Sequence, residues 1–140
     1  MLKTKYYIIA LCSHLTVLCV LLMPIIRVTE TKMTSISDKT VSSIYVNVFE
    51  FLQVNLNSLS SIIMIILMAA HVAGTVNAIV GIIKKGYVNV CVSLTFICGL
   101  ASAFMGALQL YSGSYALFAI CALTFLAISF CSVRLIKIEH

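Results

Sequence analysis

The sequence predicts an all-α membrane protein: a four-transmembrane-helix antiparallel bundle with a short β-hairpin and/or an interfacial helix in the first external loop. Of the 140 residues, 62% are hydrophobic and only 9% are charged, and the mean hydropathy is +1.16. About a quarter of the residues of a soluble domain are charged, so this chain cannot build a polar shell. Its apolar residues form four runs, each long enough to cross about 30 Å of hydrocarbon. We therefore expect one integral membrane domain over residues 1–140.

The first apolar run covers residues 7–26. It follows Lys3 and Lys5 and stops at Pro24 and Arg27. A basic start before an apolar run is also typical of a secretory signal peptide. This run, however, is long enough to span the bilayer, and no A-x-A cleavage site follows it. We expect an uncleaved first span.

The other three predicted spans cover residues 59–83, 88–111 and 115–135. They are separated by Lys84-Lys85-Gly86 and by Ser112-Gly113-Ser114. In lipid a spanning segment has to satisfy its own backbone hydrogen bonds, which makes each run a helix. Connections this short make consecutive helices antiparallel neighbours.

The only long connection is the external loop, residues 27–58. β-Branched residues gather at Val28-Thr29 and from Val41 to Val48, and the stretch Ser37-Asp38-Lys39 between them has turn chemistry. This pattern predicts a short hairpin. From Val48 to Leu56 the apolar residues recur at helical spacing, which predicts a short amphipathic helix at the membrane surface.

The charges predict the orientation. Three segments on one side of a four-span chain carry basic pairs: Lys3 and Lys5, Lys84 and Lys85, and Arg134 and Lys137. The external loop balances its charges, and the third connection has none. The positive-inside rule then puts both termini in the cytoplasm of a plasma membrane. Five tyrosines at predicted span ends, where such rings prefer the interface, agree: Tyr6, Tyr7, Tyr87, Tyr111 and Tyr115.

Small and polar side chains form stripes at helical spacing in three spans. Span two has Ala70, Gly74, Asn77, Ala78 and Gly81; span three has Cys91, Thr95, Cys98, Ser102, Gly106 and Gln109; span one has Cys12, Thr16 and Cys19. Small residues let helices approach closely in lipid, so we interpret the stripes as helix-packing seams. The alternative is a polar path for a small solute, but it lacks the central charge that ion and proton carriers use.

Two ionisable residues, His14 and His71, lie well inside spans. Their predicted depths differ by roughly 6 Å, so they can meet. They could bind a haem or a metal ion, or relay a proton. The simpler hypothesis is a neutral imidazole hydrogen-bonded to a neighbouring helix, with Ser13, Thr75 or Asn77 as its partner.

No motif predicts catalysis, a cofactor or a metal site. All six cysteines lie in apolar runs and are at least seven residues apart, so we interpret them as packing residues. Basic residues are too scattered to bind nucleic acid. We expect a non-enzymatic accessory or structural subunit that acts through helix–helix and external-loop contacts, with the bilayer, other membrane subunits or its own copies as partners. The alternatives are an oligomeric small-solute transporter or channel, and a haem- or metal-binding electron-transfer subunit that uses His14 and His71.

Overall fold

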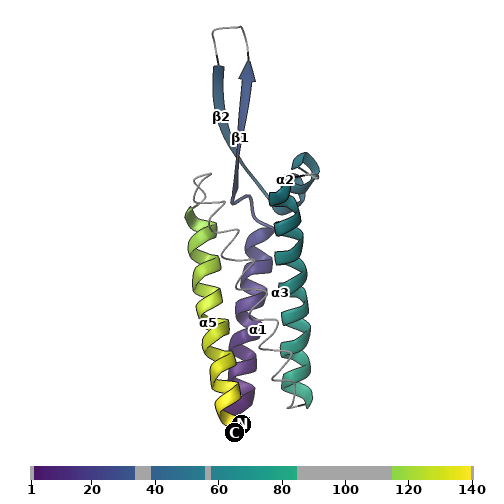
Figure 1. Ribbon diagram of the computed structural model, residues 1–140, viewed down its shortest axis with the longest axis vertical. Helices are drawn as coiled ribbons and strands as arrows, with labels where there is room; N and C mark the ends of the chain where they lie inside the picture. Colours follow the sequence, from purple (N-terminus) through teal and green to yellow (C-terminus); the bar gives the residue numbers. More distant parts are fainter. Residues whose placement is uncertain (1, 34–38, 56–57, 85–114, 140) are drawn as a thin grey trace.

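A computed structural model of the chain describes residues 2–33, 39–55, 58–84 and 115–139. It is mostly helical and elongated, with a two-stranded sheet at one end (Figure 1). In chain order the elements are α1 (Leu2–Leu21), β1 (Ile26–Met33), β2 (Lys39–Val46), α2 (Val48–Asn55), α3 (Leu59–Lys84) and α5 (Tyr115–Glu139). The predicted span over residues 88–111 lies outside the described residues.

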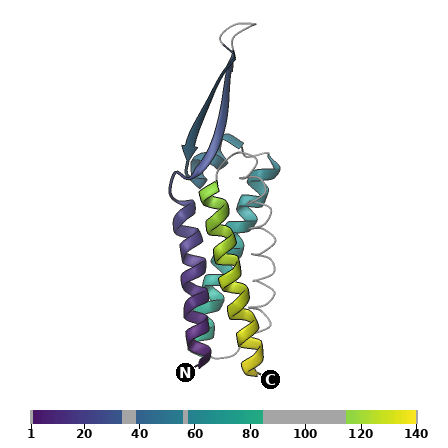
Figure 2. The same cartoon turned by 90° about the vertical axis from the view of Figure 1, so that its left-hand side faces the viewer.

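Three of the helices, α1, α3 and α5, are long and apolar enough to cross a membrane. Helix α1 packs against both of the others. The start of α1 and the end of α5 lie at the same end of the molecule (Figure 1). Helices α3 and α5 both run from the hairpin end toward that end, which Figure 2 shows from the side.

The helix ends differ from the predicted spans where charged residues or proline intervene. Helix α1 already begins at Leu2 and α5 continues to Glu139, because lysines and arginine extend a helix beyond its apolar part. The predicted end of the first span at Ile26 is wrong. The helix stops at Leu21, three residues before Pro24, which cannot continue it, and Ile26 instead begins β1.

Strands β1 and β2 pair antiparallel, from Ile26 opposite Val46 to Met33 opposite Lys39. The predicted hairpin is thus present as a small two-stranded sheet. Its first strand, β1, is longer than the β-branched pair Val28-Thr29 that predicted it. It projects away from the helices (Figures 1 and 2). Among its side chains that the structure describes, Ile26 at the base is buried while Val41 is 65% exposed.

Helix α2 follows the sheet directly and has a reciprocal cap at its start. The side-chain oxygen Oδ1 of Asn47 accepts hydrogen bonds from the backbone N–H groups of Phe49 and Glu50, each at 3.0 Å. In return Oε2 of Glu50 accepts from the N–H of Asn47, also at 3.0 Å. This arrangement satisfies N–H groups that a helix start leaves without partners.

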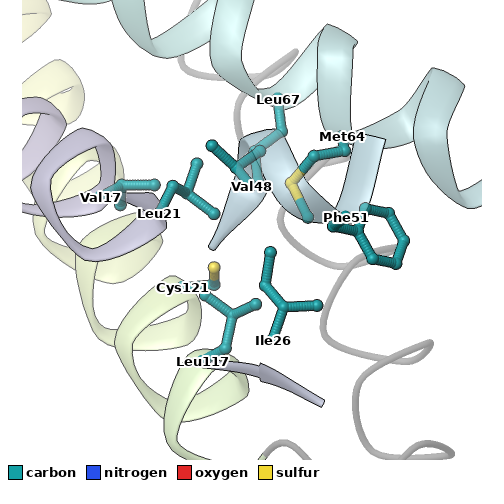
Figure 3. Close-up of a cluster of buried hydrophobic side chains, with 9 residues drawn as sticks. All are labelled: Val17, Leu21, Ile26, Val48, Phe51, Met64, Leu67, Leu117 and Cys121. Atoms are coloured by element: carbon teal, nitrogen blue, oxygen red, sulfur yellow. The ribbon is translucent and has the colours of Figure 1, made fainter. Parts of the chain in front are cut away.

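The main hydrophobic core lies where the hairpin meets the helices. All elements except β2 contribute buried side chains to it: Val17, Leu21, Ile26, Val48, Phe51, Met64, Leu67, Leu117 and Cys121 (Figure 3). Ile26 and Val48 flank the hairpin and are fully buried. The core therefore fixes the base of the hairpin to the hairpin end of the helices.

Candidate functional site

The two membrane histidines meet between α1 and α3. Nδ1 of His14 lies 3.0 Å from Nδ1 of His71, a hydrogen-bond distance. Their ring centroids are 5.2 Å apart and the ring planes are inclined by 66°. Both side chains are buried, His14 with 4% and His71 with 1% of its surface exposed.

The hydrogen bond needs one Nδ1 to carry a proton and the other to accept it. Nε2 of His71 is buried and has no hydrogen-bond partner among the described residues. A buried N–H without an acceptor is rarer in proteins than an unpaired acceptor. The geometry therefore favours His71 as the donor at Nδ1 and His14 as the acceptor, with an unpaired lone pair left on Nε2 of His71.

Gly74 provides the space for the His14 ring. A Cβ atom placed at Gly74 would overlap that ring and would lie only 2.7 Å from its Nδ1. Gly74 is one turn of α3 beyond His71, so both belong to the same buried face of α3. The closeness of the two helices at this point depends on a residue without a side chain.

The predicted seam residues of span two all lie on this face. Ala70, Gly74, Asn77, Ala78 and Gly81 are buried, and a Cβ atom at Gly81 would overlap the ring of Tyr7. Tyr7 is fully buried between the helices; its predicted depth at the membrane interface stays a prediction. Cys98, Ser102 and Gly106 of the other predicted seam lie outside the described residues.

The stripe predicted in span one does not form a seam between the described helices. Cys12, Thr16 and Cys19 are exposed, and the Thr16 hydroxyl donates to the carbonyl of Cys12 at 2.8 Å. The buried face of α1 is the opposite one, which carries His14 and Val17. In lipid, small polar residues can satisfy themselves on their own helix, so a stripe does not by itself identify the packed face.

The expected partners of the histidines were also wrong in two cases. Ser13 donates to the carbonyl of Ile9 at 2.9 Å. Thr75 donates to the backbone carbonyl of His71 at 2.8 Å rather than to its ring. Each imidazole is instead the partner of the other. The sequence could have indicated that a large ring from another helix fits beside His71, because Gly74 follows it by one turn, but not that this ring is His14.

The geometry bears on what the pair can bind. A haem with two histidine ligands has its macrocycle between the two imidazoles, and the direct nitrogen–nitrogen contact leaves no room for one. Among the described residues, no group of three or more His, Cys, Asp and Glu side chains lies close enough to hold a metal ion. The site therefore consists of the two Nδ1 atoms of His14 and His71, which face each other.

A second candidate surface is the free part of the hairpin. Three of its apolar side chains are exposed: Val41 (65%), Ile44 (44%) and Tyr45 (56%). All three belong to β2, whose sequence has no charged residue after Lys39. Natural proteins usually protect a free strand edge with charges or proline, and β2 lacks this protection over most of its length.

No protein family, curated protein or solved structure matches this chain.

Proposed function

We propose that this protein is a non-enzymatic accessory subunit of a membrane complex, which holds a partner protein through the β2 strand of its hairpin. The observation that carries the proposal is the exposed β2 strand, which has no charged residue after Lys39 and which pairs with β1 alone among the described residues. An isolated two-stranded hairpin is marginally stable in water, and a third strand or a covering surface stabilises it. A partner strand added to β2 would supply both backbone hydrogen bonds and cover for Val41 and Tyr45.

The proposal includes a topology: four crossings of the plasma membrane, with both termini in the cytoplasm. Helices α3 and α5 run in the same direction (Figures 1 and 2). The sequence between them contains the apolar run 88–111, which is long enough to span the bilayer, and this supports a fourth crossing. Both chain termini lie at the end of the bundle opposite the hairpin. Helices α1, α3 and α5 carry basic residues at that end, and these support its cytoplasmic position: Lys5, Lys84 and Lys137.

The same topology supports an external hairpin, because the hairpin lies at the opposite end of the molecule from both termini (Figure 1). Phe49 of α2 is 55% exposed beside it, in a helix with a polar side. An aromatic side chain in this position suits the interface between headgroups and acyl chains. The partner would then be a protein with an external part close to the membrane surface.

The test is purification of the tagged chain from its native membrane in mild detergent, with quantification of co-purifying proteins. Wild-type protein should retain one protein at a defined ratio. Val41→Lys and Tyr45→Lys should each reduce that ratio by about tenfold or more, because they place a charge on an interface centre. Thr29→Lys, which adds the same charge to an exposed position of β1, is the matched control and should keep the ratio. Recovery of the wild-type chain alone as a monomer would contradict the proposal.

A further inference from the structure

The end of the bundle that carries both termini is strongly basic. Helices α1, α3 and α5 contain a single acidic residue, Glu139. All their basic residues lie near this end (Figure 1): Lys3, Lys5, Lys84, Arg134 and Lys137. The positive-inside rule accounts for such a bias without any specific ligand. Arg134, however, is held by aromatic side chains, which the orientation of the spans does not require.

The guanidinium group of Arg134 lies over an aromatic ring of its own helix. Its carbon Cζ is 5.2 Å from the centroid of the Phe130 ring, one turn earlier, which is within the range of a cation–π interaction. The Phe130 ring in turn lies against Tyr6 of α1, with centroids 6.3 Å apart and ring planes inclined by 65°. Two helices therefore position this guanidinium. The contact is with a ring rather than with a carboxylate, so it leaves the positive charge of Arg134 without a counter-ion.

The exposed face of α5 changes its chemistry along the helix. Five exposed side chains recur at spacings of three and four residues, which places them on one side of α5. In order toward the helix end they are Leu123, Leu126, Phe130, Arg134 and Lys137. The two leucines are 66% and 62% exposed, and Phe130 is 53% exposed. The order is apolar, then aromatic, then basic, which matches the acyl chain, the glycerol region and the phosphate of a phospholipid.

We propose that this face of α5, together with Tyr6 of α1, binds one anionic phospholipid in the leaflet at the terminal end of the bundle. The guanidinium of Arg134 binds the lipid phosphate through two parallel hydrogen bonds, and Lys137 adds a second positive charge beside it. One acyl chain lies along Leu126 and Leu123. The Phe130 ring, supported by Tyr6, keeps the guanidinium at the level where the phosphate meets the chains.

The charges of the site favour an anionic headgroup over a zwitterionic one. Arg134 and Lys137 bring two positive charges to one face of α5, and the spacing of five residues puts position 139 on another face. A zwitterionic headgroup would bring its own cation next to these charges. A net negative headgroup gains about 1 kcal/mol for each basic residue close to it.

The position of Arg134 favours a lipid over a free phosphate ion. The apolar stretch of α5 extends from Tyr115 to Ile138, so Arg134 lies one turn before its end and is reached from the bilayer. A phosphate ion would meet the basic residues alone, whereas a phospholipid also covers the exposed leucines. The proposal goes beyond the proposed function and does not depend on the hairpin or on a protein partner.

Two sets of variants separate the site from the general positive charge of this end. Arg134→Lys keeps the charge but loses the planar group that stacks on rings and binds phosphate with two hydrogen bonds. Lys84→Gln removes a charge from the same end of the bundle, but on α3, which lies across α1 from α5 (Figure 1). Phe130→Leu removes the ring under Arg134. Phe125→Leu makes the same change in the middle of α5 and is the matched control.

The test is native mass spectrometry of the purified chain in mild detergent, titrated with dioleoyl phosphatidylglycerol or dioleoyl phosphatidylcholine. Wild-type protein should bind one phosphatidylglycerol about tenfold more tightly than phosphatidylcholine. Arg134→Gln should reduce this preference by about fivefold, and Arg134→Lys and Phe130→Leu by about threefold each. Lys84→Gln and Phe125→Leu should retain it. Circular dichroism of every variant verifies that it is folded.

Three results would overturn the proposal. An equal reduction in Arg134→Gln and Lys84→Gln would attribute the preference to the overall charge of this end. A wild-type preference in both Arg134→Lys and Phe130→Leu would show that the guanidinium and its aromatic support play no part. Displacement of the lipid by inorganic phosphate at the same concentration would assign the site to a free anion. None of these results bears on the proposed contact through β2, which uses the opposite end of the molecule.

Discussion

Gly81 of α3 lies directly against the ring of Tyr7 of α1, so close that a Cβ atom at position 81 would lie 2.6 Å from Cδ1 of the ring. Tyr7 is fully buried there, beside Leu135 of α5. One residue without a side chain thus allows an aromatic ring to fill the space between the helices, near the start of α1 and the end of α3.

The first prediction concerns this contact. Gly81→Ala should destabilise the folded protein by about 1–3 kcal/mol, because the added methyl group forces the Tyr7 ring or the helix backbone to move. Thermal or denaturant unfolding in detergent measures the change. Ala73→Leu, at an exposed position of the same helix, should change the stability by less than about 0.5 kcal/mol. Equal effects of the two substitutions would mean that this close contact is absent.

The hydrogen bond between His14 and His71 should appear as coupling in a double-mutant cycle. Replacing one histidine with leucine leaves the other Nδ1 buried without a partner, whereas replacing both removes the polar groups together. We expect the double variant to be less destabilised than the sum of the single variants, by about 0.5–2 kcal/mol. Unfolding free energies of the four proteins give the coupling directly. Strict additivity would show that the two rings do not interact.

The base and the free part of the hairpin should respond differently to truncation. Ile26 is fully buried in the core that joins the sheet to the helices, so Ile26→Ala should cost about 2–4 kcal/mol. Val41→Ala, at a site 65% exposed, should cost less than about 0.5 kcal/mol in the isolated protein. Unfolding measurements on both variants test this contrast. A large loss in Val41→Ala would mean that another part of the same chain covers β2.

The cap of α2 gives a prediction about local stability. Asn47→Ala removes the acceptor for the N–H groups of Phe49 and Glu50 and should cost about 1 kcal/mol. Asn47→Asp keeps the acceptor and should restore most of it. Amide hydrogen exchange in detergent should become faster in α2 of the alanine variant and remain unchanged in α3. Uniform acceleration across both helices would contradict a local cap.

The proposed orientation can be tested by chemical labelling in intact cells. A cysteine introduced at Ser42, an exposed position of β2, should react with a membrane-impermeant maleimide added outside. A cysteine at Lys137, exposed near the end of α5, should react only after the membrane is made permeable. The unsubstituted chain measures the background from native thiols. The reverse pattern would invert the topology.

Much of the fold could be predicted because hydropathy reports directly on the solvent. Helix α3 begins at Leu59 and ends at Lys84, almost the same bounds as those of the predicted apolar run 59–83. The agreement is close because lipid leaves the backbone few alternatives to a helix. The same signal misjudged the ends of α1 and α5, because Lys3, Lys5 and Lys137 lie in helix that extends beyond the apolar run. It also missed that Ile26 belongs to a strand, since an apolar residue after Pro24 fits a span or a core equally well.

The site was harder to predict, because a lipid-facing surface and a packed surface are both apolar. In α1 the small side chains of Cys12 and Cys19 predicted a packing seam, yet the face of α1 that packs against other helices is the one with His14. In α3 the small residues are on the buried face, where glycine has a specific use. Which ring occupies the space at Gly74 depends on the relative rotation and depth of two helices, and sequence spacing within one helix cannot supply either.

The separation of 57 residues between the two histidines has a consequence for biosynthesis. Translation at about 5–20 residues per second delivers His71 roughly 3–11 s after His14. Until His71 has been made, the imidazole of His14 lacks the hydrogen-bond partner that it has in the folded chain. The contact between α1 and α3 at this point can therefore form only after synthesis of most of the first half of the chain.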